Sequence, residues 1–285
     1  MRIASNRIED ILKFALQELE GIYLENEIKQ MTYNLITHFC NIPKTSILAN
    51  TQQAVLESEL LKMNFAIKDL KKEKPLQYIM GYTDFYNIKL NLNHKVLIPR
   101  PETEELVDMI IKENKGRKDL KIADLGCGSG AIALAIKKNI PQSEVWAFDI
   151  DDEAINQTKE NAKSLNLDIN IEKKDLLNDN FSNYNFDIIA SNPPYVMEKE
   201  KSLMRDNVLN HEPHQALFVK DEDPLIFYQA IERIAQKNLN FKGKLYMEIN
   251  ESLSESTKNV FKDYNTSIIK DLFGKFRFIS AEKLA

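Results

Sequence analysis

The stretch that decides the fold runs from Leu120 to Ala131 and reads LKIADLGCGSGA. Its first half is apolar enough for a buried strand, and three glycines in five residues follow, at Gly126, Gly128 and Gly130. Glycine lets the backbone turn sharply and approach a ligand closely. The residues from 131 to 138 then have the pattern of a helix. A strand, a glycine loop and a helix in this order predict a nucleotide-type binding site.

Strands and helices alternate along the rest of this half of the chain. Strands are expected at 120–125, 144–149, 169–173, 187–190, 244–249, 267–272 and 276–280, and helices at 131–138, 153–165, 225–239 and 253–264. This alternation predicts a mostly parallel sheet with helices on both faces. The turn Phe273-Gly274-Lys275 is too short for a parallel crossover, so the last two strands are expected to be antiparallel.

The chain before this region has a different pattern. Apolar residues fall on one helical face over 8–19, over 28–39 and from near Thr51 to Leu70, and Pro75 ends the third helix. Alternation over 86–92 predicts a strand, with Val96-Leu97-Ile98 as its return partner, and another helix is expected from Glu102 or Thr103. We therefore expect a helical domain at 1–75, a β-hairpin linker at 76–101 and an α/β domain at 102–285.

The composition narrows the class of protein. The 285 residues include 43 acids and 38 bases, a net charge of −5, which argues against non-specific binding to nucleic acid. The two cysteines, Cys40 and Cys127, lie far apart without metal-type spacing, which favours a reduced cytosolic setting. The first residues lack the apolar core of a signal peptide, and no apolar run approaches the roughly 20 residues of a membrane helix. We expect a cytoplasmic protein without membrane contact.

Two acidic residues are candidates for holding a nucleotide. Asp149 ends the second strand about 20 residues beyond the glycine loop, where an acid commonly binds ribose hydroxyls. Asp175 and Leu176 follow the third strand, where an acid can accept the adenine amino group and an apolar side chain can pack on the ring; a surface turn is the competing interpretation. The loop also fits a dinucleotide fingerprint, so alone it does not separate a dehydrogenase from a methyltransferase.

The motif Asn192-Pro193-Pro194-Tyr195 follows an apolar strand. Two consecutive prolines fix φ and remove two backbone donors, so the carbonyls of Asn192 and Pro193 are held with no neighbouring N–H to compete for them. The amide oxygen and a backbone carbonyl can each accept one N–H of a planar NH2 group, and the tyrosine ring can pack on it. The alternative is a proline-rich turn without chemistry.

Histidine chemistry is not indicated. His211-Glu212-Pro213-His214 offers two histidines with no third metal ligand in view, so no metal is expected. No Ser-His-Asp or Cys-His arrangement is apparent either.

Together these motifs resemble the protein-(glutamine-N5) methyltransferases that modify peptide chain release factors, the HemK/PrmC family. The resemblance rests on five stretches, namely PLQYIMG at 75–81, LIPRPETE at 97–104, the glycine loop, SNPPY at 191–195 and Glu212-Pro213 before Ala216-Leu217. It implies a Rossmann-like class I S-adenosylmethionine-dependent methyltransferase domain with a mixed seven-stranded sheet, a small N-terminal helical domain and a β-hairpin linker. The helical domain would recognise a folded substrate.

The resemblance also implies roles for individual residues. Gly126, Cys127, Gly128, Ser129 and Gly130 would wrap the methionine end of S-adenosyl-L-methionine, Asp149 would hold its ribose, Asp175 and Leu176 would border its adenine, and Asn192 would adjoin it. Asn192, Pro193, Pro194 and Tyr195 would bind the glutamine of a Gly-Gly-Gln motif, with Asn192, Pro193 and Tyr195 as catalytic residues.

Two other functions remain in view. An adenine-N6 or guanine-N2 methyltransferase would use the same Asn-Pro-Pro-Tyr clamp on a flipped base. The net charge and the absence of an obvious target-recognition domain disfavour it, and no stable nucleic-acid binding is expected. A non-catalytic module that binds a translation factor is disfavoured by the intact glycine loop, Asp149 and Asn192.

Overall fold

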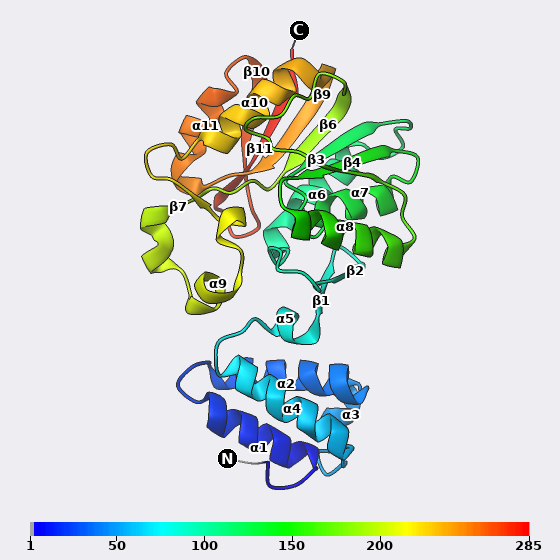
Figure 1. Cartoon of the computed structure of the whole chain (residues 1–285), viewed down its shortest axis with the longest axis vertical. Coiled ribbons are helices and arrows are strands. Elements are labelled where there is room, and N and C mark those ends of the chain that lie inside the picture. Colours follow the sequence, from blue (N-terminus) through cyan, green and yellow to red (C-terminus); the bar gives the residue numbers. More distant parts are fainter. Residues whose placement is uncertain (1–2, 285) are drawn as a thin grey trace. The chain divides into compact units, whose positions relative to one another are not determined.

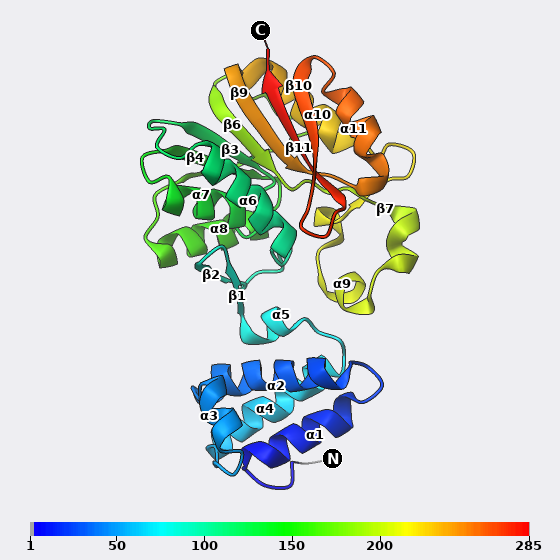
Figure 2. The same cartoon turned by 180° about the vertical axis from the view of Figure 1, so that it is seen from behind.

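The protein, described here as a computed structural model covering residues 3–284, divides into two compact units. One unit comprises the chain up to Gly81 together with Arg205–His211, and the other comprises Tyr82–Met204 and the chain from Glu212 onward. Figures 1 and 2 show the ribbon of each unit from two sides.

The first unit is built from helices around one apolar core. Its helices are α1 (Ile8–Leu19), α2 (Glu25–Cys40), α3 (Lys44–Ala49), α4 (Glu57–Leu70) and α5 (Leu76–Met80). The long helices α1, α2 and α4 pack against one another and bury Ile11, Leu35 and Ile67 completely. This is the amphipathic pattern that the sequence predicts.

The start of α4 differs from the expectation of a helix from Thr51. The segment before Glu57 is extended, because Val55 N donates to Asn6 O at 2.9 Å and the Asn6 side chain donates back to Val55 O at 2.8 Å. This pairing with the beginning of the chain competes with helix formation. The spacing of apolar residues in the sequence carries no information about this pairing.

A short segment from the second half of the chain belongs to the helical unit. It contains α9 (Asp206–His211). His211 Nε2 lies 3.0 Å from the carbonyl oxygen of Lys72, and Arg205 lies 3.9 Å from Glu27. The ring of His211 therefore has a hydrogen bond within this unit.

The second unit begins with a tight β-hairpin, and here the predicted pairing is wrong. Strand β1 (Tyr82–Phe85) pairs with β2 (Ile88–Asn91) across a two-residue turn in which Tyr86 and Asn87 have positive φ values of 41° and 61°. Residues 96–98, expected as the return strand, are not in a strand. Ile98 N instead donates to the Glu212 carboxylate at 3.2 Å. The predicted linker thus contains α5, a short hairpin and an irregular segment.

The sheet of this unit is mixed and has seven strands, as expected. Its strands, in the order β10-β11-β9-β6-β3-β4-β5, are β10 (Tyr264–Lys270), β11 (Phe276–Lys283), β9 (Leu239–Glu248), β6 (Phe186–Ser191), β3 (Lys121–Leu125), β4 (Glu144–Asp149) and β5 (Asn170–Lys173). Strands β5, β4, β3, β6 and β9 are parallel, while β11 runs antiparallel to β9 and β10.

Helices cover both faces of the sheet (Figures 1 and 2). On one face lie α6 (Pro101–Glu113), α7 (Ala131–Asn139) and α8 (Asp152–Leu165), packed on side chains such as Ile122. On the other lie α10 (Ile226–Asn238) and α11 (Ser254–Val260), packed on side chains such as Ala123. Successive strand residues point to opposite faces, so apolar strands build two cores.

Short elements follow β6 at the carboxyl edge of the parallel strands. They are β7 (Val196–Met197), η1 (Glu198–Leu203), η2 (His214–Ala216), β8 (Phe218–Val219) and η3 (Glu251–Leu253). Strand β7 pairs in parallel with β8, so the chain comes back to β7 after the segment between Met197 and Phe218. The last part of this segment, from Glu212 onward, therefore lies beside the Asn192 loop.

Candidate functional site

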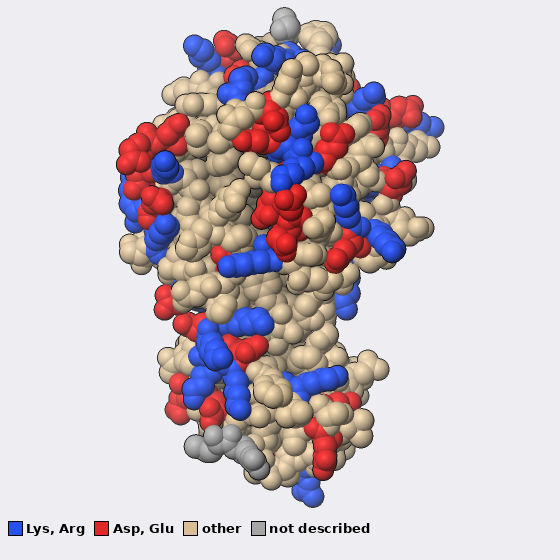
Figure 3. Space-filling view, in the orientation of Figure 1, with Lys and Arg blue, Asp and Glu red and all other residues tan. Residues whose placement is uncertain are grey.

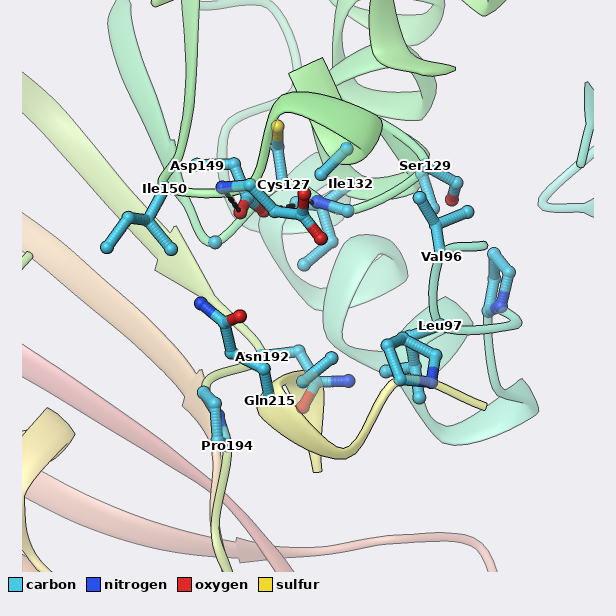
Figure 4. Close-up of a pocket in the computed structure, with 18 of the residues that line it drawn as sticks. Val96, Leu97, Cys127, Ser129, Ile132, Asp149, Ile150, Asn192, Pro194 and Gln215 are labelled. Atoms are coloured by element: carbon cyan, nitrogen blue, oxygen red, sulfur yellow. Dashed lines mark hydrogen bonds between the residues drawn. The ribbon is translucent and has the colours of Figure 1, made fainter. Parts of the chain in front are cut away.

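A cavity with an empty volume of about 990 Å³ opens at the carboxyl ends of β3, β4 and β6. Its wall includes Lys95, Val96, Leu97, Pro99, Thr103, Gly126, Cys127, Gly128, Ser129, Ala131, Ile132, Asp149, Ile150, Asp151, Ala154, Lys174, Leu176, Asn192, Pro194, Pro213, Gln215, Ala216 and Phe227. Figure 4 shows Asn192 across this cavity from Asp149 and the glycine loop. Ligands of parallel α/β sheets bind at this edge.

The side chains of Asp149 and Thr158 hold the glycine loop by hydrogen bonds. Asp149 Oδ2 accepts a hydrogen bond from Gly128 N at 2.9 Å, and Asp149 Oδ1 accepts one from Asp151 N at 3.0 Å. Thr158 donates to Gly128 O at 3.0 Å from α8. The loop backbone is therefore rigid where it lines the cavity, and Asp149 both fixes the loop and faces the site.

Gly130 serves the loop without lining the cavity. Its φ is +81°, and a Cβ placed on it would lie 2.9 Å from Thr158 Cγ2 and 3.0 Å from Leu134 Cδ1. Both neighbours are fully buried. Gly130 therefore allows α8 to pack closely against the loop, and it is not among the residues that line the cavity.

Replacing Gly130 by alanine should lower the free energy of unfolding by about 2–4 kcal/mol, because backbone strain and steric overlap in the core both oppose the new side chain. Denaturant unfolding measures this change. Gly116→Ala is the matched control, since its φ is +84° but no atom lies within 4 Å of the added Cβ. Equal losses for both variants would contradict the steric argument.

Two carboxylates lie beside the loop, Asp124 buried and Asp149 half-buried. Asp124 is 1% exposed; its Oδ2 accepts from Ala133 N at 3.1 Å, while its Oδ1 has no hydrogen-bond partner among the described residues. Burial raises the pKa of Asp124 to about 7 and also raises the pKa of Asp149. Buried acids with raised pKa values favour a positively charged ligand, which would stabilise their ionised forms.

The Asn192 loop lies between this cavity and a second one. The second cavity has an empty volume of about 290 Å³ and is lined by Leu97, Arg100, Asn192, Pro193, Tyr195, Val196, Ala216 and Leu217. Leu97, Asn192 and Ala216 line both cavities. A ligand in the first cavity and a side chain in the second would therefore meet at Asn192.

Hydrogen bonds support the Asn192 loop from α6, from the end of β9 and from Asn250 just beyond it. Asn192 Nδ2 donates to Thr103 Oγ1 at 3.2 Å, and the Thr103 hydroxyl donates to the carboxylate of Glu248 at the end of β9. The Tyr195 hydroxyl donates to the other oxygen of Glu248 at 3.4 Å. The Asn250 side chain donates to Tyr195 O at 3.1 Å. The motif is thus anchored at both ends.

An ion pair holds Arg100, which lines the second cavity. Arg100 lies 2.6 Å from Glu212, which is 2% exposed and also accepts from Ile98 N. The pair joins the segment before α6 to the segment that follows α9. Sequence reasoning quoted both residues as part of family motifs but gave neither a function.

The structure separates the expected site residues into groups. Gly126, Cys127, Gly128, Ser129, Asp149, Leu176 and Asn192 line the larger cavity, while Pro193 and Tyr195 line the smaller one and Pro194 lines the larger. Asp175 is not on the cavity wall. Its carboxylate accepts from Leu177 N at 2.8 Å and from Asn178 Nδ2 at 2.7 Å, which is the geometry of the surface turn that competed with the adenine role.

Sequence reasoning assigned no role to Thr103, Glu248 or the Arg100–Glu212 pair. The sequence does show that Glu248 directly follows the apolar strand residues 245–247. Nothing in the sequence links this acid to Asn192. Among the described residues no group of three or more potential metal ligands comes together. In residues 3–284, no helix has both the length and the apolar character needed to cross a membrane.

Comparison with known families and proteins adds independent information. The model of the "Methyltransferase small domain" matches residues 102–217, and that of the "PrmC N-terminal domain" matches residues 10–81. The release factor glutamine methyltransferase of Flavobacterium psychrophilum is 41% identical over 270 residues, which cover 93% of this chain and 95% of that protein. The one of Bacteroides thetaiotaomicron is 37% identical over 279 residues, covering 96% and 99%.

Proposed function

The chain belongs to the release factor glutamine methyltransferase family, and from this premise we propose that it methylates the side-chain amide nitrogen, N5, of the glutamine in a Gly-Gly-Gln motif of peptide chain release factors. The methyl donor is S-adenosylmethionine. One observation carries the proposal, namely that Asn192 lies on the walls of both cavities with its Nδ2 turned to Thr103. Its Oδ1 is therefore available to accept an N–H from the substrate.

The residues of the larger cavity fit the cofactor. The glycine loop, the Asp149 carboxylate and the apolar side chain of Leu176 suit, in turn, a methionine moiety, a ribose and an adenine ring. The Asp149 carboxylate on the cavity wall, with a second carboxylate at Asp124 buried in β3 and the pKa of each acid raised by burial, suits a cation. When bound, S-adenosylmethionine supplies a methyl group activated by a sulfonium charge.

The smaller cavity fits the acceptor glutamine. Asn192 Oδ1 and the Pro193 carbonyl would each accept one N–H of the amide, and the Tyr195 ring would pack on its plane. The residue before a proline and the proline itself have restricted backbones, so these acceptors are fixed before the substrate arrives. Glycines beside the glutamine would let the substrate backbone enter a cavity of this size.

The task of these residues is alignment. An amide nitrogen is a poor nucleophile because its lone pair is delocalised into the carbonyl, so the protein must hold it in line with the methyl group and stabilise the charge that develops on it. Asn192 Oδ1 and Pro193 O do both, because they accept the N–H bonds that become more acidic as the nitrogen is alkylated. The proton can leave to water after transfer.

The helical unit is proposed to recognise the body of the release factor, away from the chemistry. Such contacts would select one exposed glutamine among many by positioning a whole folded partner. A cytoplasmic setting belongs to the same proposal, because the chain's relatives modify factors of translation.

A nucleic-acid methyltransferase remains the alternative from the same fold. It would need a surface that attracts phosphates. Figure 3 shows acidic and basic side chains next to one another over most of the visible face, and the group of basic side chains on the lower unit has acidic side chains beside it. The net charge is −5. We therefore propose that the chain forms no stable complex with nucleic acid.

The decisive experiment supplies labelled S-adenosylmethionine with an intact release factor, a short Gly-Gly-Gln peptide, tRNA, rRNA or DNA. We expect mass spectrometry to locate one methyl group on the glutamine of the release factor. The peptide should be methylated at least tenfold less efficiently in kcat/KM, because it lacks the remote contacts. A methyl group found only on a nucleobase would overturn the proposed function, and equal efficiency for peptide and factor would remove the recognition role of the helical unit.

A further inference from the structure

We propose that Glu248, acting through the Thr103 hydroxyl, is a positioning residue that sets which end of the Asn192 amide faces the substrate. The inference rests on the proposed function, since it concerns how the acceptor oxygen of the clamp is oriented. It assigns a role to two buried polar residues, Thr103 on the wall of the larger cavity and Glu248 behind it, that act through the Asn192 amide.

An asparagine amide has two ends of nearly equal shape and opposite hydrogen-bonding character. Only Oδ1 can accept an N–H from a substrate amide, and a flip of the side chain would present Nδ2 instead. A flipped Asn192 would meet the substrate NH2 with two donors facing each other. The orientation of this side chain is therefore essential to the clamp, and a partner at the far end must fix it.

Thr103 is that partner, and its hydroxyl has a single hydrogen to give. Thr103 lies in the first turn of α6, is 3% exposed, and contacts Asn192 Nδ2 at 3.2 Å. Its hydrogen is directed to Glu248 Oε1. Because that hydrogen is already donated, only the lone pairs of the Thr103 hydroxyl face Asn192. Lone pairs can accept an N–H from Nδ2 but form no hydrogen bond with Oδ1.

Glu248 sets this direction because an ionised carboxylate can only accept. The side chain is 1% exposed, and its second oxygen accepts from the Tyr195 hydroxyl, so one carboxylate supports the first and last residues of the motif. We call the two hydrogen bonds from Asn192 to Thr103 and from Thr103 to Glu248 the relay. Protonation of Glu248 would reverse its direction. A carboxylic acid could donate to Thr103, whose own hydrogen could then turn to Asn192 and favour the flipped amide.

The surroundings of Glu248 make this reversal accessible near neutral pH. Burial raises the pKa of Glu248 to about 7, although the bonds from Thr103 and Tyr195 and the positive charge of Arg277 on β11 favour ionisation. Glu102 on α6 is a further negative charge that opposes it, and the Tyr228 hydroxyl on α10 is the other titratable group close by. The active form is the ionised one, so activity should decline as the pH falls below about 7.

Thr103→Val tests the relay, because valine keeps the shape and removes the hydroxyl. The single-turnover rate on release factor, at saturating S-adenosylmethionine, should fall about 10- to 100-fold, the range typical of a lost supporting hydrogen bond. Affinity for the cofactor should change less than threefold. Thr103→Ser restores the hydroxyl and should recover the rate to within about threefold of wild type. Thr257→Val is the matched control, since Thr257 is fully buried and its hydroxyl has no hydrogen-bond partner among the described residues.

Glu248→Gln tests the direction of the relay through the pH profile. A glutamine can turn its oxygen to Thr103 and its NH2 to Tyr195, so it should keep activity at neutral pH within about tenfold and lose the decline toward low pH. Binding of the cofactor and the thermal midpoint, measured beside the rates, separate positioning from folding. An unchanged rate in Thr103→Val, or an acid limb that persists unchanged in Glu248→Gln, would overturn the relay. If wild-type protein labelled no glutamine, the proposed function itself would be what failed.

Discussion

Replacing Asn192 by alanine should lower the single-turnover rate of methyl transfer by about 100- to 1,000-fold, the loss expected when one preorganised group that stabilises developing charge is removed. Affinity for S-adenosylmethionine should change less than threefold. The side chain lies at the junction of the two cavities, where it acts on the nucleophile rather than on the methyl donor. Rapid-quench measurement with saturating cofactor isolates the chemical step, and calorimetry gives the affinity.

Asn192→Asp is a useful companion, because it keeps an oxygen toward the substrate while losing the Nδ2 donor to Thr103. We expect a rate between those of alanine and wild type. A loss confined to KM, with kcat unchanged, would show that Asn192 binds substrate and transition state equally and would contradict its proposed role. A wild-type single-turnover rate in Asn192→Ala would remove the residue from the mechanism.

The core of the sheet was predictable because it depends on local patterns. Three glycines after an apolar strand leave few alternatives to a strand–loop–helix unit, and the apolar runs of β3, β4 and β6 are what strands buried on both faces require. Proline restrictions are equally local, so the rigid loop at Asn192 could be inferred from the motif itself.

The hairpin shows where local patterns mislead. Apolar residues at 96–98 look like a returning strand, but the turn at Tyr86-Asn87 closes the hairpin earlier, and Ile98 N bonds instead to Glu212, which is 114 residues away. A partner so distant in sequence leaves no periodic signal. The extended start before α4 has the same cause, because it pairs with residues near the beginning of the chain.

Some residues of the site could be predicted from local motifs, and others could not. Residues that bind through the backbone or end a strand, such as Gly128 and Asp149, are visible as motifs. The hydrogen bonds that join Asn192, Thr103 and Glu248 are not visible, since these residues come from the loop after β6, from α6 and from β9 and meet only after the sheet is assembled. Asp175 shows the converse, because an acid after a strand can equally satisfy its own turn.

Replacing Asp149 by alanine should weaken S-adenosylmethionine binding by about 100- to 1,000-fold. The carboxylate holds Gly128 N and Asp151 N while facing the cavity, so its removal loosens the loop and deletes the acceptor proposed for the ribose. Hydrogen bonds to a charged group contribute about 1.5–3 kcal/mol each, and two or more are lost. Calorimetric titration at constant pH measures the change.

Asp149→Asn separates these two functions. It keeps one acceptor oxygen, so we expect an intermediate affinity that depends on whether Gly128 N or the ribose claims that oxygen. Asp152→Ala is the matched control, because Asp152 is exposed, pairs with Lys173 at 2.7 Å and lies outside the cavity wall. Both Asp149 variants should fold, since the cores on either side of the sheet are untouched, and circular dichroism checks this. Because binding precedes chemistry, single-turnover rates extrapolated to saturating cofactor should recover far more in Asp149→Asn than in Asn192→Ala. Wild-type affinity in Asp149→Ala would remove this carboxylate from the cofactor site.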